Sequence, residues 1–143
     1  MSIGRICNRD VWIAAHNETA ATAASRMAQH NVGTLLVVND RRQPIGILTD
    51  RDLVTRVMAV GQNPNETLVG SIMTHHPLTV SEDTSIEQAV GMMRSGGFRR
   101  MPVVADCEQL VGIVSLDDVL HLLADEFAKV GGLLDTGSHS RRE

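Results

Sequence analysis

The chain repeats itself at an interval of 66 residues. Residues 3–57 align with residues 69–123 without a gap, and 11 of the 55 aligned pairs are identical. The plainest match is GILTDRD at 46–52 with GIVSLDD at 112–118, where a glycine and an apolar run precede a hydroxyl residue and, three residues later, an aspartate. Both copies of an internal repeat are expected to adopt the same local structure. The chain is therefore a tandem duplication of one unit.

Each copy shows the same order of hydrophobic periodicities. Apolar residues at i, i+3, i+4 and i+7 predict one helix over 20–27 and its equivalent over 86–93. Two short β-rich runs separated by a polar turn follow in each copy and predict adjacent strands. A second helix is predicted to begin at Thr49 and at Ser115. With a strand ahead of the first helix, each copy reads strand, helix, strand, strand, helix.

These elements predict an α+β fold in which two β-α-β-β-α repeats pack face to face with pseudo-two-fold symmetry. One copy alone is too small to bury its sheet well, so the pair is expected to share a core and leave a crevice between strand ends. The first repeat is assigned to 3–60, a linker rich in turn residues to 61–68, and the second repeat to 69–128. Residues 129–143 gain Gly and Ser and predict a flexible tail.

Composition argues against several functions. Against 17 acidic residues the chain has 13 basic ones and a net charge of −4, so no basic face for nucleic acid or anionic lipid is expected. Without a signal-peptide core or an apolar span, we expect no membrane association and a cytoplasmic location. Cys7 and Cys107 predict free thiols in a reducing compartment. Adjacent His75 and His76 lack a third ligand at helical spacing, so no metal is predicted.

Several phrases together resemble the paired cystathionine-β-synthase (CBS) domain, or Bateman module. They are the two matched phrases above, GRIC and GSIMT at the starts of the copies, and FRRMPVV before the middle strand of the second. The resemblance covers about residues 3–128. It implies a regulatory, signal-transduction module that binds an adenosine-containing ligand between the repeats. AMP, ADP, ATP and NAD are the candidate ligands, and no catalytic domain is expected beside the pair.

Two interpretations of the repeated hydroxyl and aspartate stay open. Thr49 with Asp52, and Ser115 with Asp118, have the spacing of a helix N-terminal box, which needs no ligand. The resemblance implies in addition that the hydroxyl contacts phosphate and the aspartate contacts ribose. An ionised aspartate can accept hydrogen bonds from both ribose hydroxyls, and one geometry serves both roles.

The polar residues are more numerous in the second repeat, which predicts a tighter site at Asp118 than at Asp52. Arginine suits phosphate because its guanidinium can bind bidentately, although each arginine could instead lie on a solvated face. With one Trp, two Phe and no Tyr, adenine is expected to be held by aliphatic side chains and backbone edges. The candidate ligand-binding residues are Thr49, Arg51, Asp52, Thr79, Val80, Arg99, Arg100, Met101, Pro102, Ser115 and Asp118.

No catalytic motif can be placed on these elements, and we expect no enzyme. The single lysine, Lys129, does not form a Gly-Lys-Ser/Thr phosphate loop, and no Ser-His-Asp order or HExxH motif occurs. The alternative function is a purely structural or protein-interaction module with an empty cleft. The small-residue face of the helix at 20–28, with the apolar second helices, predicts a homodimer. A regulated effector protein of unknown identity is also expected.

Overall fold

Two small β-sheets form the centre of the molecule. The computed structural model describes residues 1–140 and the side chains of residues 1–136. The strand order is β1-β2-β3-β4 in one sheet and β5-β6-β7 in the other. The strands are β1 (Ile13–Ala14), β2 (Thr34–Val38), β3 (Pro44–Thr49), β4 (Thr74–His75), β5 (Val80–Ser81), β6 (Arg100–Val104) and β7 (Leu110–Ser115).

Strands at equivalent places in the two repeats pair in the same way. β1 is parallel to β2, as β5 is to β6, whereas the pairs β2 with β3 and β6 with β7 are antiparallel. Both antiparallel pairs shift register at the same place, between Val37 and Val38 and between Val103 and Val104. The predicted α+β fold with two pseudo-symmetric repeats is therefore confirmed.

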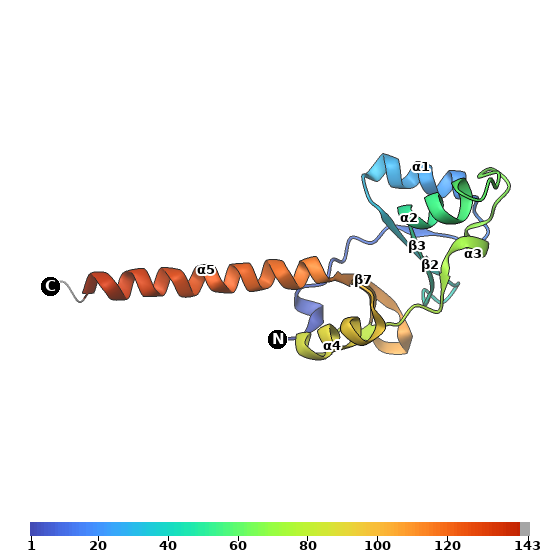
Figure 1. The fold of residues 1–143 in the computed structure, drawn as a ribbon. Helices are drawn as coiled ribbons and strands as arrows, with labels where there is room; N and C mark the ends of the chain where they lie inside the picture. Colours follow the sequence, from blue (N-terminus) through green and yellow to red (C-terminus); the bar gives the residue numbers. More distant parts are fainter. Residues whose placement is uncertain (141–143) are drawn as a thin grey trace.

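The helices flank the sheets (Figure 1). α1 (Ala20–His30) and α4 (Ile86–Gly96) are the equivalent first helices, and each buries an alanine and methionine face against its own sheet. Thr19 and Ser85 cap them, because each hydroxyl accepts the backbone N–H three residues on. The other helical segments are η1 (Ile3–Arg5), α2 (Asp50–Leu53), the π-helical turn η2 (Val54–Met58), α3 (Val69–Ile72), η3 (Asp106–Glu108) and α5 (Leu116–Ser140).

The first segment of each repeat packs on the other repeat. Ile3 is fully buried in the core of the second repeat, and its N–H donates to the carbonyl of Thr84 at 2.8 Å. Val69, its equivalent, is buried in the core of the first repeat and donates to the carbonyl of Glu18 at 2.8 Å. The two repeats are thus interlocked, so the sequence boundaries at 3–60 and 69–128 divide the chain but not the two cores.

This exchange explains the glycine that opens both repeated phrases. A Cβ at Gly112 would lie 2.7 Å from the carbonyl oxygen of Asn8, and a Cβ at Gly46 would overlap the Met73 side chain. Asn8 and Met73 belong to the segments that cross from the other repeat. A side chain at either glycine would therefore push the crossing segment away.

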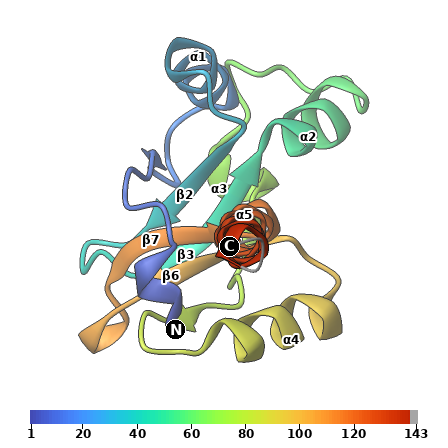
Figure 2. The ribbon, with the colours of Figure 1, turned by 90° about the vertical axis from the view of Figure 1, so that its left-hand side faces the viewer.

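Helix α5 corrects the prediction of a flexible tail over 129–143. The helix continues to Ser140 and projects away from the two sheets, as Figures 1 and 2 show. At 1.5 Å per residue it is about 38 Å long. Gly131 and Gly132 weaken helix propensity, but apolar residues keep a three-to-four spacing through this stretch, so the helical period does not stop at 128. Residues 141–143 lie outside the described residues.

Candidate functional site

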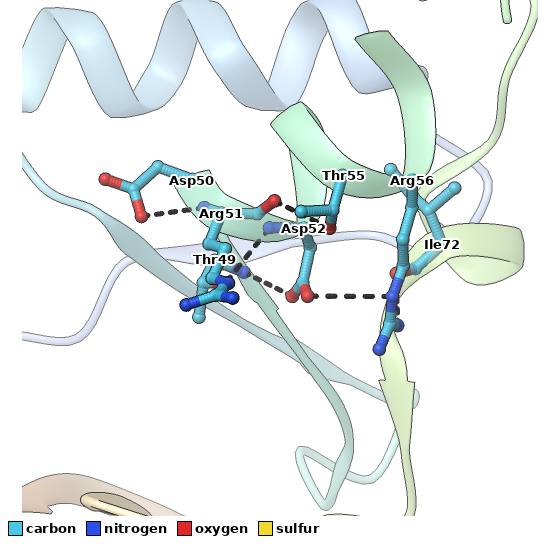
Figure 3. A network of polar contacts seen from close by, with 7 residues as sticks. All are labelled: Thr49, Asp50, Arg51, Asp52, Thr55, Arg56 and Ile72. Carbon is cyan, nitrogen blue, oxygen red and sulfur yellow. Dashed lines mark hydrogen bonds and ion pairs between the residues drawn. The ribbon is translucent and has the colours of Figure 1, made fainter. Parts of the chain in front are cut away.

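The repeated hydroxyl and aspartate form a capping box at the start of both second helices. Thr49 Oγ1 accepts the N–H of Asp52 at 3.3 Å, and Asp52 Oδ2 accepts the N–H of Thr49 at 2.9 Å (Figure 3). In the second repeat the same contacts join Ser115 and Asp118 at 3.2 and 2.7 Å, and the Ser115 hydroxyl lies 3.0 Å from Asp118 Oδ2. The capping interpretation is therefore confirmed in both repeats.

One of these boxes opens into a cavity of about 240 Å³, which we call the Asp118 pocket. Its wall combines the capping box of the second repeat with the segments that precede β1 and β2 in the first repeat. The lining residues are Asn8, Asp10, Val11, Trp12, Val32, Gly33, Thr34, Leu36, Arg100, Ile113, Ser115 and Asp118. The site is thus shared between the repeats.

The equivalent cavity at the other box, which we call the Thr49 pocket, has a volume of about 410 Å³. Thr49 comes from the first repeat, and most of the remaining wall comes from the second. The lining residues are Ile47, Thr49, Thr74, His76, Pro77, Leu78, Phe98, Arg99 and Arg100. Most positions lie 66 residues from a residue of the Asp118 pocket, so the two pockets are related by the internal duplication.

The two arginines of the second repeat, Arg99 and Arg100, differ in which pocket they line. Arg99 lines the Thr49 pocket and a hollow of about 90 Å³ beside Ser115, but it does not line the Asp118 pocket. Arg100 lines both pockets. The polar residues of the second repeat, which predict a tighter site at Asp118, are therefore divided between the two pockets, because each pocket takes its walls from both repeats.

Three candidate residues lie in the core of the second repeat instead of at a pocket. Val80 and Met101 are 3% and 0% exposed and belong to its hydrophobic cluster, and Pro102 is fully buried. Thr79 and Arg51 line neither pocket. Asp52 also lines neither pocket. The candidate residues that do line a pocket are Thr49, Arg99, Arg100, Ser115 and Asp118.

The two aspartates differ in their surroundings. Asp52 Oδ1 lies 3.7 Å from Arg56 Nε, and the Arg56 guanidinium also donates to the carbonyl of Ile72 at 2.8 Å (Figure 3). The residue equivalent to Arg56 in the second repeat is Leu122. Within residues 1–136, the hydrogen bonds to the Asp118 side chain all fall on Oδ2. Asp118 therefore lines its pocket with no hydrogen bond from a described residue on Oδ1, whereas Asp52 Oδ1 lies at ion-pair distance from an arginine.

Each pocket also has one aromatic wall, which the sequence analysis did not anticipate. Trp12 is 39% exposed, lines the Asp118 pocket and stacks on His30 with a centroid distance of 3.6 Å and an interplanar angle of 13°. Phe98 lines the Thr49 pocket. An indole face can stack on a planar base, so adenine is not restricted to aliphatic contacts in the Asp118 pocket. The only sequence feature that relates Trp12 to a pocket is its alignment with Leu78, which lies beside the first strand of the second repeat and lines the Thr49 pocket.

The two cysteines are free thiols in different environments. Cys107 is exposed, whereas Cys7 is partly buried in the segment that crosses onto the second repeat. Burial raises the pKa of the Cys7 thiol, and the charges of Glu82 and Asp118 raise this pKa further while Arg9 opposes them. The thiolate of Cys7 is consequently disfavoured at neutral pH.

Among the described residues, no three His, Cys, Asp or Glu side chains gather as a group that could hold a metal ion. The rings of His75 and His76 lie 6.4 Å apart and tilted. No helix within residues 1–140 is both long enough and apolar enough to cross a bilayer.

Comparison with known proteins identifies the repeated unit. The family model for the CBS domain matches residues 3–59 and 69–125. A protein of Methanopyrus kandleri is 40% identical over 122 residues, which cover 85% of this chain and 62% of that protein. Hypoxic response protein 1 of Mycobacterium tuberculosis is 32% identical over 120 residues, which cover 84% of this chain and 83% of that protein.

Solved structures give the same result. The crystal structure of Hypoxic Response Protein I, which has two coordinated zinc ions, has a TM-score of 0.75 and 31% identity, and the match covers 85% of this chain and 98% of that one. The CBS domain pair of MJ0100, in complex with 5'-methylthioadenosine and S-adenosyl-L-methionine, has a TM-score of 0.73 and 27% identity, with 86% and 99% covered. The chain belongs to the CBS-domain family, as a tandem pair of CBS domains.

Proposed function

We propose that the chain is a regulatory module that senses an adenosine-containing ligand and acts without catalysis of its own. The observation that carries this proposal is the Asp118 pocket, where an available carboxylate oxygen, a hydroxyl and an indole ring line one cavity. The carboxylate suits ribose hydroxyls and the indole suits a purine. The complex of the MJ0100 CBS pair with two adenosyl compounds supports the same ligand class.

The ligands we propose are AMP, ADP, ATP and NAD, to which that complex adds S-adenosylmethionine and methylthioadenosine. Thr49, Arg99 and Arg100, which line the Thr49 pocket, are the proposed phosphate contacts, because hydroxyl and guanidinium groups donate to phosphate oxygens. The proposed ribose contact is Asp118, because Asp52 lines neither pocket. A purely structural or protein-interaction module is the alternative.

A thermal-shift panel of these ligands on the whole chain tests the proposal. At a ligand concentration of 100 times Kd, binding to the folded state adds roughly 2.7 kcal/mol to the free energy of unfolding. We expect the melting temperature to rise with at least one adenosyl compound and not with ribose or adenine-free phosphate alone. No rise with any adenosyl compound would favour the structural alternative.

We also propose a homodimer, assembled through the second helices. Large apolar side chains of α5 are 47–75% exposed at a spacing typical of helix pairing: Leu120, Leu123, Phe127, Val130 and Leu134. On the first repeat, Val54 and Met58 are 53% and 76% exposed. Light scattering at micromolar concentration should give twice the 15.5 kDa chain mass, and Phe127→Asp should reduce it. A monomer for the parent would refute this assembly.

A regulated effector protein and a cytoplasmic location complete the proposal. CBS-domain matches include longer proteins, such as one of Arabidopsis thaliana of which this chain spans 22%. A solved neighbour from Burkholderia ambifaria is described as a putative signal-transduction protein with CBS domains. These relatives support a regulatory role. Copurification of the chain with and without saturating ligand would test for an effector whose binding depends on the ligand.

A further inference from the structure

The two pockets differ in charge. The Asp118 pocket is lined by two carboxylates, Asp10 and Asp118, and by one guanidinium, that of Arg100. The Thr49 pocket is lined by Arg99, Arg100 and a histidine, and no carboxylate occurs among the residues that line it. Since Arg100 lines both cavities, the difference rests on the other charged groups.

The charge difference arises at positions that the duplication makes equivalent. Asp10 in the Asp118 pocket corresponds to His76 in the Thr49 pocket, and Gly33 corresponds to Arg99. Both changes make the Thr49 pocket more positive. The carboxylate of Asp52 does not offset them, because it is 15% exposed and pairs with Arg56 instead of lining the cavity.

Ligand charge decides which pocket is favourable. A phosphate in the Asp118 pocket would face two carboxylates, and like charges at close range repel. In the Thr49 pocket the same phosphate would meet guanidinium groups that bind it bidentately. A nucleoside without phosphate avoids the repulsion, and its ribose hydroxyls can donate to Asp118 while its base stacks on Trp12.

We infer that the two pockets select adenosyl ligands by charge, so that the Asp118 pocket takes a nucleoside without phosphate and the Thr49 pocket takes a nucleotide. This inference rests on the proposed function, because it assigns adenosyl ligands without phosphate to one pocket and adenine nucleotides to the other. It predicts that one chain binds both classes at once without competition between them.

Trp12 allows the two sites to be read separately. It is the only tryptophan of the chain, and it lines the Asp118 pocket but not the Thr49 pocket. The experiment titrates the whole chain with adenosine and with ADP, following heat by calorimetry and tryptophan emission in parallel. We expect both ligands to release or absorb heat, adenosine to change the emission, and ADP to leave it nearly unchanged.

Two variants with matched controls assign the sites. Asp118→Asn should weaken adenosine by about 10- to 150-fold and leave ADP unchanged, because it removes charge-assisted hydrogen bonds. Arg99→Gln should weaken ADP over the same range and leave adenosine unchanged. The controls are Asp125→Asn and Arg94→Gln, which change the same residue types at positions that line neither pocket.

The outcomes are distinguishable. Mutual displacement of adenosine and ADP, or an equal loss of both affinities in Asp118→Asn and in Arg99→Gln, would overturn the selection by charge while leaving the proposed function intact. A chain that binds neither probe, and no other adenosyl compound, would overturn the proposed function and the inference together. Independent binding with the two losses separated supports both.

Discussion

The helices that follow the two repeated phrases begin alike and continue differently. Both start with a capping box, but α2 passes into a π-helical turn that ends at Met58, whereas α5 runs without a break to Ser140. At the position four residues beyond the aspartate, the first helix has Arg56 and the second has Leu122. The capping box at the start of the helix is therefore the same in both repeats, whereas the residue four positions beyond its aspartate differs.

The largest effect we expect comes from the two glycines under the crossing segments. Gly112→Ala should lower the free energy of unfolding by about 1–3 kcal/mol, because its Cβ would meet the backbone oxygen of Asn8 at 2.7 Å. Gly46→Ala should cost less, because the atoms it meets belong to the flexible Met73 side chain. Chemical denaturation of both variants checks the order. Equal losses, or a larger loss for Gly46→Ala, would contradict the packing described.

The next largest effect is expected when Arg56 is replaced by leucine, the residue at the equivalent position 122. Arg56→Leu should cost about 1 kcal/mol of stability, mainly through the hydrogen bond to the Ile72 carbonyl, since an exposed pair at i,i+4 contributes at most about 0.5 kcal/mol. It should also free Asp52 for a ribose. Calorimetric titration with adenosine would then find a second, weaker site.

The control for this exchange is Arg51→Leu, which removes an arginine of the same turn that makes no ion pair with Asp52 in the described part of the chain. It should leave a single adenosine site. If Arg56→Leu also leaves a single site, the pairing with Arg56 is not what separates the two aspartates.

The smallest effect concerns the thiols. Because burial raises the pKa of Cys7, its thiolate fraction at pH 8 is below that of an ordinary thiol, and alkylation should be slower than at exposed Cys107. Because the thiol pKa of Cys7 is higher in the folded than in the unfolded state, its contribution to the free energy of unfolding is complete below the unfolded-state pKa. This contribution is lost as the pH rises through the folded-state pKa. Mass spectrometry of iodoacetamide labelling from pH 7 to 10 measures the rates. Faster labelling of Cys7 at pH 8 would contradict the burial.

Local features of the sequence predicted much of this molecule. The apolar run at 34–38 is a strand with the predicted bounds, and both capping boxes form where the spacing places them. These features depend on neighbours a few residues away, and a helix cap closes on its own backbone whatever lies beyond it. For the same reason the pairing of Thr49 with Asp52 and of Ser115 with Asp118 needed no tertiary information.

Features that depend on the other repeat could not be predicted this way. The burial of Ile3 in the second core and the place of Trp12 in the pocket wall arise from contacts between distant segments, which leave no period in the sequence. Arg99 and Asp118 line different pockets for the same reason. The sequence prediction ends α5 too early for another reason. Its glycines lower helix propensity, although the apolar spacing of a helix continues past 128.

Each pocket takes its walls from both repeats, and adenosine binding to three variants checks that the ligand uses both. Trp12→Leu takes the residue of the equivalent position 78, and Asp118→Asn and Asp52→Asn each neutralise one aspartate. Calorimetric titration should show weaker adenosine binding for Trp12→Leu and for Asp118→Asn, which lie in different repeats, and unchanged binding for Asp52→Asn. If Trp12→Leu and Asp52→Asn weakened the ligand together while Asp118→Asn had no effect, each repeat would hold its own site and the shared pocket would be wrong.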